Sequence, residues 1–133
     1  MTQNIGQIAL LVKDYDEALD YYIQKLGFKK LEDTIISETK RWVRIAPANL
    51  SGFCLLLARA VDNEQLSRVG NQTGGRVFLF LYTDDFMRDY NLYLQNGVEF
   101  IRDPTEEPYG TVAVFKDLYG NLWDLIEKNK KLV

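Results

Sequence analysis

The chain of 133 residues repeats one pattern of secondary structure twice, and this repeat constrains its fold more than any other feature. Each copy has an apolar strand, an amphipathic helix that ends at a glycine, and three further strands. Aligning Asp14 with Asp85 superimposes the two helices, and aligning Gly52 with Gly120 superimposes the two last strands. Two copies of a five-element unit predict an α+β fold built from two βαβββ modules.

The repeat predicts a single domain with module 1 at about residues 1–60, a polar connection at about 61–75 and module 2 at about 76–133. We expect Asp14 or Asp16 to cap the first helix and the pair Asp84–Asp85 to cap the second. In chain order, the expected elements are strand 7–12, helix 16–25, extended segments 28–31 and 35–38, strands 40–45 and 52–58, a short helical turn at 63–69, strand 77–82, a helix ending at 95, extended segment 98–101, a turn-rich loop at 104–110, and strands 111–115 and 122–126.

Composition excludes several classes of function. The net charge of −3 gives no general attraction to nucleic acid, and no apolar run approaches the length of a membrane span. The chain contains no histidine, which excludes every mechanism that depends on an imidazole base or ligand. The single cysteine, Cys54, cannot form an intrachain disulfide and fits a reducing compartment, so we expect a cytoplasmic protein without nucleic-acid or membrane partners.

One acidic residue stands out in the last predicted strand. Asp124 alternates with Leu122 and Ile126, so strand geometry places its carboxylate on a face with apolar neighbours. A buried carboxylate costs free energy unless it has a partner, so a carboxylate at such a position either has one or serves to bind a ligand or accept a proton. We therefore interpret Asp124 either as a ligand-orienting or basic group, or as a structural partner of Gln7 or Arg76.

Several segments together resemble the vicinal-oxygen-chelate superfamily, which includes glyoxalase I, bleomycin-resistance proteins and extradiol dioxygenases. The segments are 12–14 (Val-Lys-Asp), 18–22 (Ala-Leu-Asp-Tyr-Tyr), 26–28 (Leu-Gly-Phe), 108–110 (Pro-Tyr-Gly) and 115–124 (Phe-Lys-Asp-Leu-Tyr-Gly-Asn-Leu-Trp-Asp). The resemblance spans essentially the whole chain. It implies a glyoxalase/bleomycin-resistance/dioxygenase fold, in which the two modules form a curled mixed sheet around a cleft, and a homodimer.

The resemblance also implies where a metal would bind in the enzymes of this group. The four ligand positions of the family correspond here to Gln7, to Leu56, to Phe78 (or Val77 if the repeat shifts by one residue) and to Asp124. Leucine and phenylalanine cannot coordinate a metal ion, and two ligands, one of them a neutral amide, are too few for a usual site. We expect no metal cofactor; the alternative is an atypical divalent-metal site that uses Gln7 and Asp124.

Strand alternation predicts a largely apolar and aromatic cleft, which is typical of small-molecule sites. The candidate ligand-binding residues are Gln7, Trp42, Cys54, Leu56, Arg76, Phe78, Phe80, Tyr109 and Asp124, joined in the cleft wall by Ala9 and Leu122. For several of them a structural role is the alternative. Trp42 can belong to the core, Cys54 can be an apolar filler rather than a thiolate ligand, Arg76 can be a solvated cation rather than an anion clamp, and Tyr109 can pack on the surface.

Three functions fit these observations. The first is a metal-independent protein, like bleomycin-resistance proteins in mode, that binds a small, largely apolar or aromatic molecule in its cleft. The second is an enzyme, a glyoxalase-like lyase or a dioxygenase with an atypical metal site, in which Asp124 is catalytic. The third is a degenerate module for dimerisation or interaction. The sequence leaves the ligand and any reaction undetermined.

Overall fold

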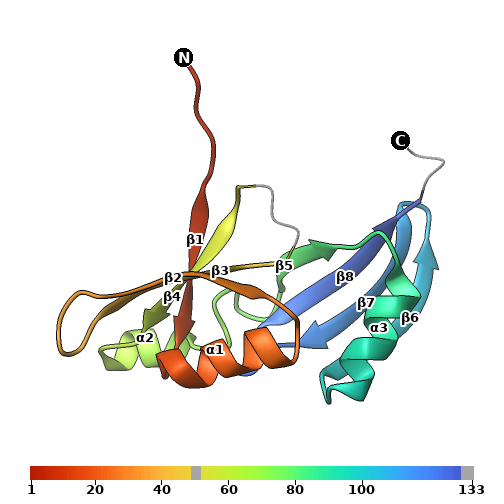
Figure 1. Cartoon of the computed structure of the whole chain (residues 1–133). Helices are drawn as coiled ribbons and strands as arrows, with labels where there is room; N and C mark the ends of the chain where they lie inside the picture. The colour runs from red at the N-terminus through yellow and green to blue at the C-terminus, as the bar shows by residue number, and fades with distance from the viewer. Residues whose placement is uncertain (49–51, 130–133) are drawn as a thin grey trace. The chain divides into compact units, whose positions relative to one another are not determined.

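Each half of the chain folds into a four-stranded mixed sheet with helices, which confirms the predicted glyoxalase/bleomycin-resistance architecture (Figure 1). The computed structural model describes residues 1–48 and 52–129 and separates into two compact units, Met1–Val69 and Gly70–Val133. The first unit contains β1 (Gln7–Val12), α1 (Tyr15–Gln24), β2 (Lys29–Ile35), β3 (Arg41–Ala46), β4 (Cys54–Arg59) and α2 (Asn63–Arg68). The second contains β5 (Val77–Tyr82), α3 (Phe86–Gln95), β6 (Glu99–Glu107), β7 (Gly110–Lys116) and β8 (Leu122–Lys128).

The first sheet has the strand order β1-β4-β3-β2, with β1 parallel to β4 and the other neighbours antiparallel. Leu57 pairs with both Leu10 and Val43, and all three side chains are almost fully buried. Because paired residues project from the same side of a sheet, they form one apolar face. Helix α1 covers this face, since the Tyr15 hydroxyl accepts a hydrogen bond from the backbone N–H of Arg41, at the start of β3.

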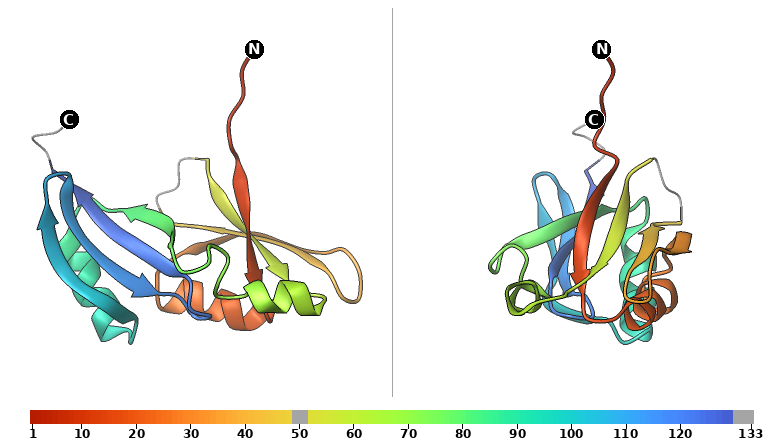
Figure 2. Two further views of the ribbon diagram at one scale, coloured as in Figure 1. Left: turned by 180° about the vertical axis from the view of Figure 1, so that it is seen from behind. Right: turned by 90° about the vertical axis from the view of Figure 1, so that its left-hand side faces the viewer.

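The second sheet repeats this order as β5-β8-β7-β6, and Figure 2 shows its strands from two further sides. Phe115 in β7 pairs with Trp123 in β8 and with Phe100 in β6. The ring of Tyr93, in α3, lies edge-on to Phe115 with a centroid distance of 5.6 Å, while Trp123 stacks on Phe115 at 5.7 Å. This aromatic cluster is the core of the second unit, and it identifies the face that α3 covers.

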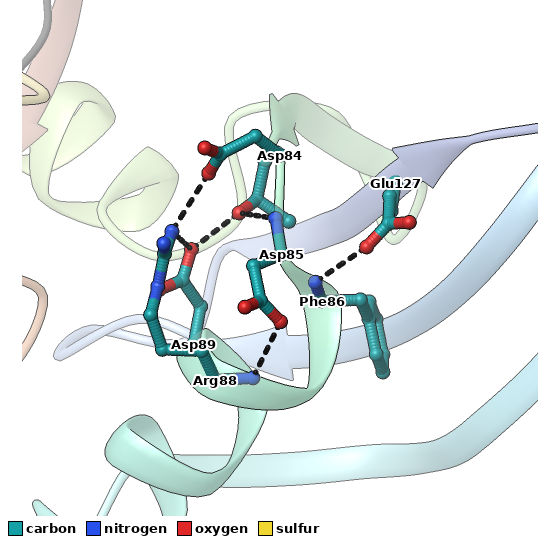
Figure 3. Close-up of polar contacts among 7 residues, drawn as sticks. Asp84, Asp85, Phe86, Arg88, Asp89 and Glu127 are labelled. Atoms are coloured by element: carbon teal, nitrogen blue, oxygen red, sulfur yellow. Dashed lines mark hydrogen bonds and ion pairs between the residues drawn. The ribbon is translucent and has the colours of Figure 1, made fainter. Parts of the chain in front are cut away.

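Helix α3 begins in a network of charged side chains (Figure 3). Asp85 caps the helix by accepting a hydrogen bond from the backbone N–H of Arg88 at 3.2 Å, as predicted for the Asp84–Asp85 pair. Glu127 reaches across from β8 and accepts from the backbone N–H of Phe86 at 2.7 Å, while the Arg88 guanidinium pairs with Asp84 at 2.8 Å. The network therefore satisfies the N–H groups of Phe86 and Arg88 in the first turn and fastens α3 to β8.

Helix α1 is capped in the same way, but by a single residue. Asp14 accepts a hydrogen bond from the backbone N–H of Glu17 at 2.8 Å, which resolves the choice between Asp14 and Asp16. The helix begins one residue earlier than predicted and ends before Gly27, whose φ of 74° is the left-handed conformation that favours glycine. Within the described residues, no helix is long and apolar enough to cross a membrane.

The predicted loop at 104–110 is wrong over its first part, because β6 continues to Glu107. Pro104 is the first residue of the predicted loop. It lies instead on the edge strand of the second sheet, inside a register irregularity between Arg102 and Thr105, where no ladder hydrogen bond from its nitrogen is required. Within residues 104–110, the turn is therefore confined to Pro108–Tyr109, just before β7.

The one-residue ambiguity at Val77 and Phe78 coincides with a register irregularity in β5. Val77 pairs with Leu122, but Leu79 pairs with Trp123, so the register shifts at Phe78. After this irregularity, Phe80 pairs with Asp124. The side chains of Phe80 and Asp124 therefore project from the same face of the second sheet.

Candidate ligand-binding site

Asp124 lies on the face of the second sheet opposite α3, which we call the α3-distal face and define by Phe80, Asp124, Val114 and Arg102. These residues form one row across the sheet, because Asp124 pairs with both Phe80 and Val114, and Val114 pairs with Arg102. The Asp124 side chain neighbours nearly buried valines and Ile126, and the residue is only 9% exposed. The structure therefore places the Asp124 carboxylate on an apolar strand face, as predicted.

The electrostatic environment of Asp124 has two opposed contributions. Burial raises the pKa of Asp124 above its ordinary value, and the positive charge of Arg102 acts in the opposite direction. No hydrogen bond or ion pair joins the Asp124 carboxylate to another of the described residues. A carboxyl group in this state can accept a proton from a bound molecule, or donate one to it, more readily near neutral pH than an exposed aspartate.

Arg102 is the charged residue that the sequence analysis missed. It lies just beyond the predicted extended segment 98–101, and two register irregularities in β6, on either side of Arg102, decide that it shares a row with Asp124. Its guanidinium pairs with Glu107 at 3.1 Å. The predicted partner Arg76, by contrast, is exposed just before β5 and forms no ion pair with any residue in the described part of the chain.

In the first unit, Gln7 and Cys54 pair across β1 and β4 on the face opposite α1, here called the α1-distal face and defined by Gln7, Cys54, Leu56, Arg44 and Trp42. The Cys54 thiol is 3.6 Å from the Gln7 side-chain oxygen and accepts a hydrogen bond from Arg44 at 3.7 Å. Arg44 also donates to Glu32 at 2.9 Å. Cys54 is only 4% exposed, so it acts as a buried link between Gln7 and Arg44.

Trp42 and Leu56 line an open hollow of about 400 Å³ at one end of the first sheet. The β3–β4 ladder pairs Val43 through Ile45 only, although β3 begins at Arg41 and β4 continues to Arg59. The ends of β3 and β4 that do not pair with each other flank the hollow, which also borders α1 and the start of α2. Its lining residues are Tyr15, Ser37, Thr39, Lys40, Arg41, Trp42, Leu56, Leu57, Ala58, Arg59, Val61 and Gln65.

The remaining candidates lie in the second unit at separate places. Phe78 is half-buried at the register shift in β5, and Phe80, two residues later, is 54% exposed. Tyr109 is 49% exposed at the turn before β7, and its carbonyl oxygen accepts a hydrogen bond from the backbone of Asn129 at 3.0 Å. Of these, only Phe80 pairs with Asp124.

The donor chemistry does not fit a usual metal site. Among residues 1–48 and 52–129, no three His, Cys, Asp or Glu side chains lie close enough together to hold a metal ion. At the first position of the family, the Gln7 amide oxygen faces the Cys54 thiol, and at the second, Leu56 is an apolar wall of the hollow. These residues offer a surface for an organic molecule rather than a set of ligands for a cation.

The Asp117 side chain accepts several hydrogen bonds, and it supports the strand that carries Asp124. One oxygen accepts hydrogen bonds from the backbone N–H groups of Tyr119, Gly120 and Asn121, at 2.9–3.2 Å. The other accepts from the Asn121 amide and from the Trp123 indole, each at 3.1 Å. The Asp-Leu-Tyr-Gly-Asn sequence is the signal for this turn, since an aspartate can bond to the backbone that follows it.

The fold defines a class of protein, and comparison with known proteins names the family. Residues 4–125 match the model of the Glyoxalase/Bleomycin resistance protein/Dioxygenase superfamily, so the chain belongs to this superfamily. It is 58% identical to an uncharacterized protein of Shewanella frigidimarina (strain NCIMB 400) over 132 residues, which cover 98% of each chain. It is 32% identical to YurT of Bacillus subtilis (strain 168) over 124 residues, covering 90% of this chain and 95% of YurT.

Solved structures show the same fold. The crystal structure of UcmS2 superimposes with a TM-score of 0.82 at 28% identity, covering 95% of this chain and 98% of UcmS2. TnmS3, an antibiotic binding protein from Streptomyces sp. CB03234, superimposes with a TM-score of 0.78 at 26% identity, covering 96% of this chain and 98% of TnmS3. Antibiotic binding is therefore one function found among structural neighbours of this chain.

Proposed function

We propose that this protein binds a small, largely apolar or aromatic molecule without a metal ion, and does so as a cytoplasmic homodimer. The observation that carries the proposal is that each unit, taken by itself, has an apolar surface with few polar groups. Trp42 and Leu56 border an open hollow, and Phe80 stands exposed beside the nearly buried Asp124. Binding of an apolar ligand to such a surface is favourable, because it removes apolar area from water. A few polar groups then orient the ligand.

The likeness to TnmS3 supports binding rather than chemistry as the first function to test. The absence of three close metal-ligating side chains in the described residues supports it as well. A binder of this kind protects the cell or stores a compound by holding it, so that affinity alone is required. In that role, Asp124 orients a hydroxyl or amine of the ligand through a hydrogen bond.

The experiment uses untagged protein, because the histidines of a tag would supply metal ligands that this chain lacks. Calorimetric titration with nickel, zinc, manganese and iron(II) is expected to give no stoichiometric binding. A thermal-shift screen of aromatic compounds, with bleomycin included, is then expected to raise the melting temperature, because a ligand that binds only the folded state stabilises it. Stoichiometric metal binding that disappears in Asp124→Ala would overturn the proposal.

A glyoxalase- or dioxygenase-type reaction is the second candidate function, and one observation favours it. Asp124 is a nearly buried carboxyl whose pKa burial raises, which is how a protein prepares an aspartate for proton transfer near neutral pH. If this function holds, Asp124→Asn abolishes turnover of a compound that the wild type converts, while the affinity for that compound stays within a few-fold. Loss of affinity with no turnover in either protein assigns Asp124 to binding instead.

A further inference from the structure

The hollow in the first unit has an unusual charge for this protein. The whole chain is acidic, with 19 aspartates and glutamates against 16 lysines and arginines. The hollow nevertheless has Lys40, Arg41 and Arg59 among its lining residues, and neither an aspartate nor a glutamate. A cationic cavity in an acidic protein attracts anions locally, because nearby charges outweigh a small and distant net charge.

Arg41 is not available to neutralise a ligand. Its guanidinium donates to Asp33 at 2.6 Å and to Asp16 at 3.0 Å, and it lies 5.2 Å from the centre of the Tyr15 ring. These carboxylates raise the pKa of Arg41 and hold its side chain in place. Arg41 and Tyr15 therefore form a fixed wall of the hollow.

Lys40 and Arg59 differ from Arg41 in this respect. Neither forms an ion pair with any residue within 1–48 and 52–129. Arg59 is the last residue of β4 and half-buried, while Lys40 is exposed just before β3. An arginine without a carboxylate partner at the edge of a cavity presents a planar pair of donors, which matches the two oxygens of a carboxylate.

The floor of the hollow is apolar. Trp42, Leu56, Ala58 and Val61 supply its apolar side chains, and Gln65 is already engaged by accepting a hydrogen bond from the backbone N–H of Val61 at 2.9 Å. The volume of about 400 Å³ is within the range of small-molecule sites, about 300–1,000 Å³. An aromatic body fits such a floor, where it contacts the Trp42 ring and displaces water from the leucine and alanine side chains.

We propose that this hollow is a subsite for an aromatic carboxylate, whose ring system lies against Trp42 and Leu56 and whose anionic group is bound by Arg59 and Lys40. This rests on the proposed function, which it extends by naming the chemical class of the ligand and the unit that binds its charged end. The subsite lies wholly within residues 15–65, so the first unit alone is sufficient to form it.

The test is calorimetric titration of the full-length protein with three probes of one shape: naphthoate, naphthamide and naphthylmethylamine. Naphthoate is expected to bind at least about tenfold more tightly than the neutral amide and more tightly still than the cation, since a charge-assisted hydrogen bond is roughly twice as strong as a neutral one. Arg59→Gln is expected to remove this preference by weakening naphthoate about tenfold and the amide less than twofold. Lys29→Gln, an exposed lysine of the same unit outside the hollow, is the matched control and leaves all three affinities unchanged.

A second variant tests the location of the ring system. Ala58→Phe places a bulky side chain in the hollow at a half-buried position and is expected to abolish naphthoate binding while the protein stays folded. Equal binding of naphthoate and naphthamide overturns the carboxylate assignment but leaves the proposed binding function in place. Naphthoate binding that survives both Arg59→Gln and Ala58→Phe places the ligand elsewhere and overturns the subsite. If none of the three probes binds but the aromatic screen finds a ligand, the subsite is overturned and the proposed binding function is kept.

Discussion

The two units have one strand order, yet their third and fourth strands pair over different lengths. In the second unit, β7 and β8 pair along their whole lengths, from Gly110 opposite Lys128 to Lys116 opposite Leu122. In the first unit, β3 and β4 pair only from Val43 to Ile45, and the strand ends that flank this ladder border the hollow. One topology therefore produces a tightly paired sheet in one copy and a sheet with an open end in the other.

The difference indicates that the two copies of the repeated module have different roles. The second unit is tightly fixed by the Asp117 turn, the aromatic cluster around Phe115 and the long β7–β8 ladder, and its nearly buried Asp124 carboxylate has no ion pair with another described residue. In the first unit, Arg41 and Arg44 form ion pairs, Lys40 and Arg59 form none among the described residues, and the hollow leaves room for a ligand. We interpret the second unit as the more rigid support and the first as the more adaptable binding surface.

Replacing Asp117 is the strongest way to break the comparison. Asp117→Ala leaves the N–H groups of the turn and the Trp123 indole without their acceptor, and we expect the free energy of unfolding to fall by about 4 kcal/mol. Urea denaturation followed by tryptophan fluorescence measures this loss. Asp103→Ala, at an exposed position, is the control and is expected to change stability by about 0.5 kcal/mol or less. A loss below about 1 kcal/mol for Asp117→Ala would show that the turn is not the main support of β8.

Gly110 and Gly27 test how crowded the two units are. A Cβ at Gly110, where φ is 151°, would lie 2.2 Å from the Glu127 carbonyl oxygen, whereas a Cβ at Gly27, where φ is 74°, would meet nothing within 4 Å. We expect Gly110→Ala to cost about 3 kcal/mol and Gly27→Ala about 1 kcal/mol, because only the first adds a clash to the backbone strain. Thermal unfolding of both variants measures the difference, and similar losses would contradict the contrast in packing.

Arg41 tests the charge network of the first unit. Arg41→Gln removes the pairs with Asp33 and Asp16, and we expect a loss of about 1–2 kcal/mol at neutral pH. Arg41 lowers the pKa of Asp33, so the stability that this carboxylate contributes is present above the ordinary aspartate pKa and is lost as the pH falls through the lowered value. The difference between the variant and the wild type should therefore shrink in acid. Arg68→Gln, an exposed arginine without an ion pair in the described residues, should show no such pH dependence.

The smallest expected effect belongs to Asp124. Because burial raises the pKa of its carboxyl, the folded state holds a proton that the unfolded state has released, and stability falls as the pH rises from the ordinary aspartate range through the raised pKa. Asp124→Asn avoids this cost, and we expect a gain of roughly 0.5–1 kcal/mol at neutral pH that vanishes below the ordinary pKa. Denaturant curves from acid to neutral pH measure it. A loss of stability at neutral pH would show that Asp124 has a structural partner.

The local signals of the sequence were sufficient for most of the fold. Asp14 and Asp85 cap their helices, Gly27 ends α1, and period-2 alternation placed Asp124 on an apolar face, because each of these features depends on residues a few positions apart. Pro104 misled the prediction, since a proline in an edge strand has the same local sequence as a proline in a turn. The role of Asp117 was within reach of the turn chemistry that was already visible around Gly120.

By itself, then, the sequence determined the duplicated βαβββ plan and the superfamily, since these follow from periodicity and from short motifs. Only the tertiary structure decided that Arg102 shares a row with Asp124, and that β3 and β4 part beyond Val43 to leave a cationic hollow. Both outcomes depend on strand register and on the length of pairing, which are set by contacts between residues far apart in the chain, and a shift of one position reverses the face of every side chain that follows.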